Sequence, residues 1–195
     1  MITLMPSHYH RTNDFDIAII KLDKPINYVD SPMRPACIPT LGNYESQFTG
    51  VQATVAGWGL GNASAEITMA VLQKLKVEVF SSEECKKFFD ERINRRMMCA
   101  GFKEGGKDSC KVNLPLQNMF CSALSTAAFN ILMYCISPRF FKGDSGGPLI
   151  AEKSKQTWEL IGAVSWGEGC AGKALPGVYA RITGTVHKIL SVQKY

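Results

Sequence analysis

The stretch Gly143-Asp144-Ser145-Gly146-Gly147-Pro148-Leu149 places glycines on both sides of a serine. Because glycine carries no side chain, the backbone around Ser145 stays open to a reacting carbonyl group. The backbone N–H groups of Gly143 and Ser145 can point at one spot, where the carbonyl oxygen would gain negative charge during acyl transfer. The stretch therefore predicts a serine nucleophile beside an oxyanion hole, and the alternative is a tight glycine-rich turn with an incidental serine.

Three other segments decide between these two interpretations. They are Asp14-Phe15-Asp16-Ile17-Ala18-Ile19-Ile20, Ala56-Gly57-Trp58-Gly59, and Ser165-Trp166-Gly167 followed by Cys170 and Pro176-Gly177-Val178-Tyr179. Together with the serine stretch, and in this order, they resemble a trypsin-like serine endopeptidase of the chymotrypsin family over roughly residues 7–110 and 143–190. The resemblance implies an all-β, chymotrypsin-like double β-barrel with a short C-terminal helix. It also implies a polypeptide substrate or a protein inhibitor as partner, and no cofactor.

The resemblance assigns roles to single residues. Ser145 matches the nucleophile, and Asp16 matches the buried carboxylate that orients the catalytic histidine. Asp108 matches the floor of the primary pocket, where a buried carboxylate favours Arg or Lys before the scissile bond. The other substrate-binding positions line that pocket or belong to a strand edge that pairs with extended substrate backbone, namely Ser165, Trp166, Gly167 and Gly177.

The catalytic histidine of the family has no counterpart in this chain. In the family it lies well upstream of the aspartate, in an Ala-Ala-His-Cys context, and nothing similar precedes Asp16. His8 and His10 lie in a stretch that resembles a surface segment, and His187 lies in a segment that resembles the closing helix. A serine without a general base is a poor nucleophile at neutral pH. We therefore expect residues 1–195 to be inactive as a single chain.

Three functional interpretations follow. The first is a serine endopeptidase by descent, with trypsin-like specificity and acyl-enzyme chemistry, that lacks activity without its histidine. The second is a non-catalytic homologue that acts as a binding or regulatory module. The third is complementation by another chain that carries the histidine and the first barrel, bridged through Cys37. Reaction of Ser145 with a fluorophosphonate would distinguish the third interpretation from the others.

The length of the chain limits how much of two barrels it can build. We expect one partial peptidase domain over residues 1–195, in which residues 1–45 are a remnant of the first barrel with the crossover. Residues 46–195 are expected to form an essentially complete second barrel. The shortage falls on the N-terminal side, so we expect the first barrel to be mostly missing, with the Ile17–Leu22 strand and the Cys37–Pro39 crossover as its last segments. An incomplete barrel is expected to expose strand edges.

Residues 112–142 interrupt the second barrel between Cys110 and Gly143. Deleting them joins Asp-Ser-Cys-Lys directly to Gly-Asp-Ser-Gly-Gly-Pro, which is the family's pattern, so our hypothesis is a translated intron. A membrane helix fits the absence of charge from Val112 to Pro138, but it conflicts with the Pro, Asn and Gln residues there. A specificity loop of this length would be uncommon in a compact domain.

The chain has seven cysteines, an odd number that leaves at least one without a partner inside the chain. Cysteine usage of this kind indicates an oxidising, extracellular compartment. The resemblance implies disulfides between Cys85 and Cys99 and between Cys110 and Cys170, and it places Cys37 where many relatives link to a separate N-terminal chain. No Cys-x-x-Cys or histidine-rich spacing indicates zinc, so no metal site is expected.

Other features bear on processing and partners. Asn62-Ala63-Ser64 is a glycosylation sequon, usable only in a secreted chain, although Met1–Pro6 lacks the features of a signal peptide. The family's activation site is also absent, so we expect Asp144 to lack the freed N-terminal ammonium that pairs with it in active relatives. The net charge of +5 is spread along the chain, and we expect neither nucleic acid nor membrane as a partner.

Local patterns predict four elements of the second barrel. Leu75–Val79 alternates apolar and polar residues, as a half-buried strand does. Ser81 and Glu84 form a capping box that opens a short helix. Trp158–Trp166 and Gly177–Ile182 are expected to be strands.

Overall fold

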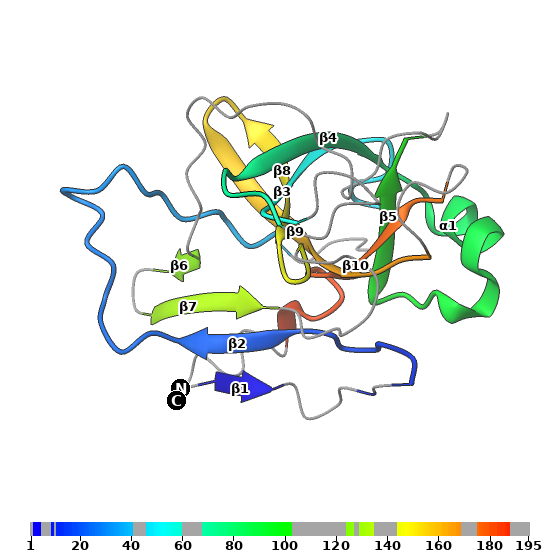
Figure 1. Ribbon diagram of the computed structural model, residues 1–195, viewed down its shortest axis with the longest axis horizontal. Helices are drawn as coiled ribbons and strands as arrows, with labels where there is room; N and C mark the ends of the chain where they lie inside the picture. Colours follow the sequence, from blue (N-terminus) through cyan, green and yellow to red (C-terminus); the bar gives the residue numbers. More distant parts are fainter. Residues whose placement is uncertain are drawn as a thin grey trace.

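The computed structural model describes residues 2–4, 9, 11–40, 46–59, 68–102, 124–126, 129–134, 144–168 and 175–187 (Figure 1). The elements within these residues are β1 (Ile2–Leu4), β2 (Ala18–Lys21), β3 (Gln52–Gly57), β4 (Gln73–Val79), α1 (Ser82–Phe89), the 3₁₀-helix η1 (Asp90–Arg92), β5 (Met97–Gly101), β6 (Leu124–Thr126), β7 (Phe129–Tyr134), β8 (Pro148–Ser154), β9 (Thr157–Trp166) and β10 (Gly177–Arg181). Over the same residues, no helix combines the length and the apolar character needed to cross a membrane.

Six strands close into a barrel in the order β10-β5-β4-β3-β8-β9. Neighbouring strands are antiparallel all the way round the barrel. Strands β8 and β9 form a hairpin whose pairing runs from Ser154 opposite Thr157 to Pro148 opposite Ala163. The barrel confirms the predicted all-β fold with one barrel largely present.

Alternate residues of these strands fill the barrel. In β4, Leu75, Val77 and Val79 are buried while Lys76 is exposed, as the alternating pattern predicted. The buried members of this core are Phe48, Ala53, Val55, Leu75, Val77, Val79, Met98, Ala100, Leu149, Ala151, Ile161, Val164 and Tyr179. Because the barrel is closed, each of its six strands has a neighbour on both sides, and most of their backbone hydrogen bonds are formed within the barrel.

A second apolar cluster joins the N-terminal residues 17–19 to the outside of the barrel. Ile17 and Ile19 belong to it from the N-terminal side, and Leu160 and Ile182 belong to it from the barrel side. Each of these four side chains is at most 6% exposed. Burial of this apolar surface holds the residues around Ile17 against β9 and β10.

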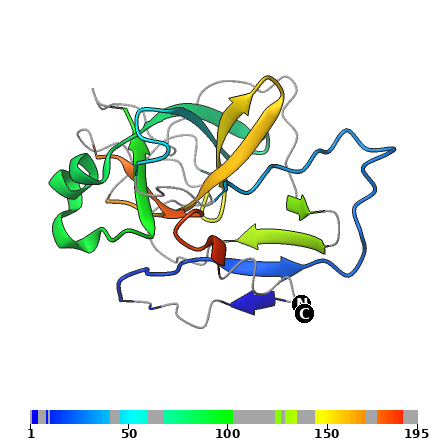
Figure 2. The same ribbon diagram turned by 180° about the vertical axis from the view of Figure 1, so that it is seen from behind.

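A four-stranded sheet with the order β1-β2-β7-β6 lies beside the barrel (Figures 1 and 2). Strand β1 pairs with one edge of β2, with Ile2 opposite Ile20, and β7 pairs with the other, with Ala18 opposite Tyr134. Both edges of β2 are therefore paired, and β1 and β6 are the outer strands of this open sheet. Strands β6 and β7 come from residues 112–142, so this segment supplies β2 with a hydrogen-bonded neighbour, β7.

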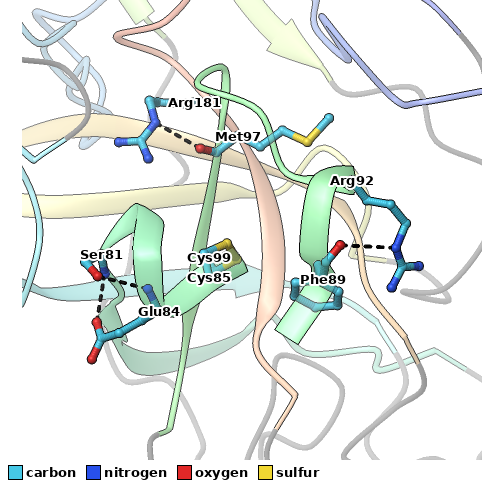
Figure 3. Close-up of a disulfide and its surroundings, with 8 residues drawn as sticks. All are labelled: Ser81, Glu84, Cys85, Phe89, Arg92, Met97, Cys99 and Arg181. Atoms are coloured by element: carbon cyan, nitrogen blue, oxygen red, sulfur yellow. Dashed lines mark hydrogen bonds between the residues drawn. A yellow bond between two sulfur atoms is a disulfide. The ribbon is translucent and has the colours of Figure 1, made fainter. Parts of the chain in front are cut away.

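Helix α1 begins where the sequence predicted. The Ser81 hydroxyl accepts a hydrogen bond from the Glu84 backbone N–H at 3.1 Å, and the Glu84 carboxylate accepts one from the Ser81 N–H at 2.9 Å (Figure 3). This confirms the capping box. The helix buries Cys85 and Phe89, and the predicted disulfide from Cys85 to Cys99 joins it to β5.

Candidate active site

Asp16 lies at the junction of the two parts of the molecule. It is 1% exposed, and the Ile17 N–H donates to the Phe15 carbonyl at 2.7 Å across it, which makes Asp16 the centre of a γ-turn. The Ser165 hydroxyl donates a hydrogen bond of 2.6 Å to Asp16 Oδ2. A buried carboxylate needs hydrogen-bond donors, so β9 both covers Asp16 and supplies one donor to it.

The turn that contains Ser145 is fixed to the same strand. The Gly147 N–H donates to the Asp144 carbonyl at 2.8 Å, which closes a four-residue turn with Gly146 in its third position at φ +83°. Only glycine adopts that φ readily, so the glycine after the serine is required by the turn. Gly146 donates to the Val164 carbonyl and Val164 donates to the Gly147 carbonyl, each at 2.9 Å. Strand β9 therefore holds the Ser145 turn through Val164 and Asp16 through the next residue.

Asp144 has a partner that the sequence did not predict. Its Oδ1 accepts a hydrogen bond of 2.6 Å from the Gly59 backbone N–H, and the residue is 8% exposed. The carboxylate occupies the space where side chains at 57 and 59 would lie, since a Cβ on Gly57 would come within 2.0 Å of it and one on Gly59 within 2.3 Å. The Ala56-Gly57-Trp58-Gly59 segment thus receives the Asp144 side chain and anchors the serine turn.

A second contact between the two parts of the molecule involves Asp14. Arg96 Nε donates to Asp14 Oδ1 at 2.6 Å, a second nitrogen pairs with Oδ2, and the guanidinium lies 4.5 Å from the centre of the Phe15 ring. Asn13 and Phe15 both have positive φ, at 52° and 53°, a conformation that is costly for a bulky residue. Arg96 therefore clamps the two residues that precede Asp16 in a strained turn. Sequence reasoning missed Arg96, because 82 residues separate it from Asp14.

The Asp14–Arg96 pair predicts a dependence of stability on pH. Burial raises the pKa of Asp14, but hydrogen bonding and charge interaction with Arg96 outweigh it, so the net pKa is lowered. A lowered carboxylate pKa stabilises the fold above the unfolded-state pKa, and this contribution disappears as the pH falls through the folded-state pKa. Asp14→Asn is expected to lower the free energy of unfolding by about 1 kcal/mol at pH 7.

Urea unfolding at pH 7, 5 and 2.5 would test this expectation. The difference between the wild type and Asp14→Asn should persist at pH 5 and be smaller at pH 2.5, because Asp14 begins to be protonated as the pH falls below the pKa of the unfolded state. Asp23→Asn serves as the control, because Asp23 is exposed. An equal difference at all three pH values would show that the charge of Asp14 contributes nothing.

Several predicted site residues lie outside the described residues. They are Gly143, Asp108, Cys110, Cys170 and Asn62, and His8 and His10, which are not expected to act as bases, lie outside the described residues as well. Of the others, Trp166, Gly167 and Gly177 are buried at the ends of β9 and β10, and His187, the one histidine among the described residues, is exposed. Cys37 is exposed and is the one free cysteine of the described part of the chain. Its backbone pairs with β9, donating to the Trp158 carbonyl and accepting from the Leu160 N–H, both at 2.8 Å.

Strand β9 thus holds both the glycine-bounded Ser145 turn and the buried Asp16. Comparisons with known proteins point to the same family as this arrangement. The family model described as Trypsin matches residues 2–114 and 115–189. The chain belongs to the trypsin family. This is the family of trypsin-like serine proteases that the sequence resembled.

Two Bos taurus relatives illustrate the trypsin-family similarity. Coagulation factor XI is 37% identical over 177 residues, and the suppressor of tumorigenicity 14 protein homolog is 33% identical over 171 residues. These matches cover 90% and 88% of this chain, but 23% and 16% of the two relatives. The chain therefore spans less than a quarter of either relative.

Proposed function

We propose that this trypsin-family domain is a serine endopeptidase that cleaves after Arg or Lys, and that residues 1–195 do not perform the reaction alone. The observation that carries the proposal is the buried Asp16 carboxylate, hydrogen-bonded to Ser165 on the strand that also holds the Ser145 turn. In the reaction Asp16 would orient a histidine, Ser145 would attack the peptide carbonyl, and Gly143 with Ser145 would donate N–H groups to the oxyanion. Asp108 would bind the cation of the substrate.

The proposed inactivity follows from the expected lack of a histidine that could act as the general base for Ser145. His187 is exposed and is the one histidine of the described part of the chain. Asp16 can orient a base and stabilise its charge, but it cannot replace the base, because the proton of Ser145 must reach a group within hydrogen-bonding distance. We expect neither His8 nor His10, which lie outside the described residues, to act as the base, so the histidine would have to come from another polypeptide.

The exposed Cys37 thiol suits a link to such a polypeptide. A first-barrel chain could be bridged to this residue in an oxidising, extracellular compartment, which the disulfide of α1 also favours. The segment 112–142 remains, in this proposal, an insertion of intron-like sequence. A polypeptide substrate or a protein inhibitor would be the partner at the site.

A non-catalytic homologue is the second candidate function. Two observations favour it together. His187, the one histidine of the described part of the chain, is exposed, and yet the barrel and the serine turn are held in place by hydrogen bonds. Such a domain would bind an extended peptide along residues 165–167 without hydrolysing it.

Binding of benzamidine, a small aromatic amidinium, tests the specificity separately from catalysis. Residues 1–195 are expected to bind it, and Asp108→Ser is expected to weaken binding by at least about tenfold, because the charge-assisted partner is lost. Peptides with Arg or Leu before the scissile bond should remain uncleaved, with Ser145→Ala as the matched control. Binding that ignores Asp108→Ser would refute the specificity. Cleavage of the Arg peptide that depends on Ser145 would refute the proposed inactivity.

A further inference from the structure

Strand β2 has a neighbour on each edge, and the two neighbours are connected to it differently. Strand β1 pairs along one edge and is joined to β2 through residues 5–17. Strand β7 pairs along the other edge, with Ala18 opposite Tyr134. Among the described strands, β7 pairs otherwise only with β6, and β6 pairs only with β7 (Figures 1 and 2). Strand pairing therefore links the β6–β7 hairpin, residues 124–134, to the rest of the described structure through one edge of β2.

Strand β2 is held against the barrel by contacts that do not involve this hairpin. Ile17 and Ile19 are 4% and 2% exposed, and they pack in one apolar cluster with Leu160 and Ile182. These contacts remain whichever strand pairs with the edge of β2. A fixed strand with an exchangeable neighbour suits binding by strand addition, in which main-chain hydrogen bonds supply the affinity.

The edge that carries β1 is less suited to an exchange. Beyond the end of β1, the Tyr9 N–H donates to the Asp14 carbonyl at 3.1 Å, so the same segment also pairs with the turn that precedes Asp16. Strand β7, in contrast, is joined to β2 through residues 22–128, which include three strands of the barrel. The hairpin can therefore leave β2 without disturbing the residues before Asp16.

The direction of β7 shows where a strand on this edge would lead. Because β7 is antiparallel to β2, its chain runs from the position opposite Lys21 to the position opposite Ala18. A partner chain that continued in this direction would next pass Ile17 and Asp16. A strand rises about 3.3 Å per residue and lies about 4.8 Å from its neighbour. The second to fourth residues after the one opposite Ala18 would therefore lie beside Asp16, within reach of an imidazole.

The residues of β2 also define the partner strand. Directly opposite residues of an antiparallel pair lie on the same face of a sheet. The residue opposite Ile19 therefore shares the face of the cluster that contains Leu160 and Ile182, so it should be apolar. In β7 this register position is taken by Met133. The partner is thus an extended strand with an apolar residue opposite Ile19 and a histidine three to five residues later.

We propose that the edge of β2 now paired with β7 is the docking edge for a strand of the polypeptide that supplies the histidine, and that the β6–β7 hairpin competes for this edge. The inference rests on the proposed function, in which Asp16 orients a histidine from another polypeptide. Only molecules whose β2 edge is unpaired bind the partner strand, so its apparent affinity is reduced in proportion to their fraction. The hairpin keeps the histidine away from Asp16 until it is displaced.

Fluorescence anisotropy with a labelled strand peptide tests the competition. The probe is Lys-Lys-Val-Thr-Val-Thr-Val-Ala-His, in which the second valine is the residue opposite Ile19. A variant whose residues 124–134 are replaced by a Gly-Ser linker of equal length is expected to bind the probe at least about tenfold more tightly than the wild type, because the competing hairpin is gone. Residues 113–123 replaced in the same way, with Cys121 retained, are the matched control and should leave the wild-type affinity unchanged. Equal affinity of the wild type and the hairpin-free variant, or no binding to that variant, would overturn the proposal.

Hydrogen exchange of the wild type follows the displacement without any substitution, so it also decides the question if the linker variant does not fold. With the peptide at saturating concentration, the amides of residues 129–134 are expected to exchange at least about tenfold faster, while those of Ala18–Lys21 keep their protection. Unchanged protection of residues 129–134 under these conditions would overturn the docking edge.

Labelling of Ser145 by a fluorophosphonate separates this inference from the proposed function. The hairpin-free variant with the bound peptide is expected to react at least about tenfold faster than with the same peptide carrying Gln in place of His. Displacement of the hairpin without this acceleration would support the docking edge and refute the supply of a base through it. Acceleration by a histidine-bearing polypeptide that leaves residues 129–134 protected would support the proposed function and overturn the docking edge.

Discussion

Fluorophosphonate labelling of Ser145 in purified residues 1–195 is expected to be at least about 10⁴-fold slower than in a serine endopeptidase with a complete triad. The expected loss is large because the members of a triad act as a unit. In this chain the buried Asp16 carboxylate accepts a hydrogen bond from Ser165. His187, the one histidine in the described part of the chain, is exposed. We therefore expect no histidine to take the Ser145 proton as the phosphorus is attacked. A time course of intact mass measures the rate.

Ser145→Ala is the control for labelling at other serines. Labelling of the wild type within minutes would contradict the expected inactivity and show that a base is present. Replacing His8, His10 and His187 by glutamine, one at a time, would then identify that base. If a second polypeptide supplies the histidine, labelling should accelerate on its addition, and Cys37→Ala should weaken the acceleration if the two chains are bridged there.

The parts of the fold that local sequence specifies were predicted correctly. Leu75–Val79 alternates because one face of β4 is in the barrel core, and the Ser81 capping box depends on residues three positions apart. The disulfide of Cys85 with Cys99 followed from the family resemblance rather than from any local pattern. Each of these predictions needs only short separations along the chain or a known relative.

The contacts that assemble the site were not predictable in this way. Asp16 and Ser165 are 149 residues apart, and Gly59 and Asp144 are 85 residues apart. Contacts between such distant residues depend on how strands pair, and a single sequence carries no periodic signal for them. The left-handed conformation of Phe15 was also unexpected, because sterics disfavour it for a bulky residue, and tertiary contacts such as the Arg96 clamp are needed to hold it.

Gly59→Ala is expected to destabilise the fold by about 3 kcal/mol or more, because a buried carboxylate fills the space that the new methyl group needs. The added Cβ would lie 2.3 Å from Asp144 Oδ2 and 2.4 Å from its Cγ. Asp144 cannot turn away without losing its 2.6 Å hydrogen bond from the Gly59 N–H, and it is 8% exposed. Either adjustment would displace the turn that carries Ser145. Urea unfolding at pH 7 measures the loss.

A double-mutant cycle tests whether the clash with Asp144 is the cause. Asp144→Ala removes the carboxylate and destabilises the fold on its own, because the Gly59 N–H loses its acceptor. In that background Gly59→Ala is expected to cost at least about 2 kcal/mol less than in the wild type, which is a large coupling energy for two residues in contact. Additive costs would instead show that the clash with Asp144 is not the cause of the destabilisation. Close packing of Gly59 against Asp144 would then not restrain the serine turn, and its restraint would rest on the hydrogen bond from the Gly59 N–H and on those between Val164 and the Gly146–Gly147 pair.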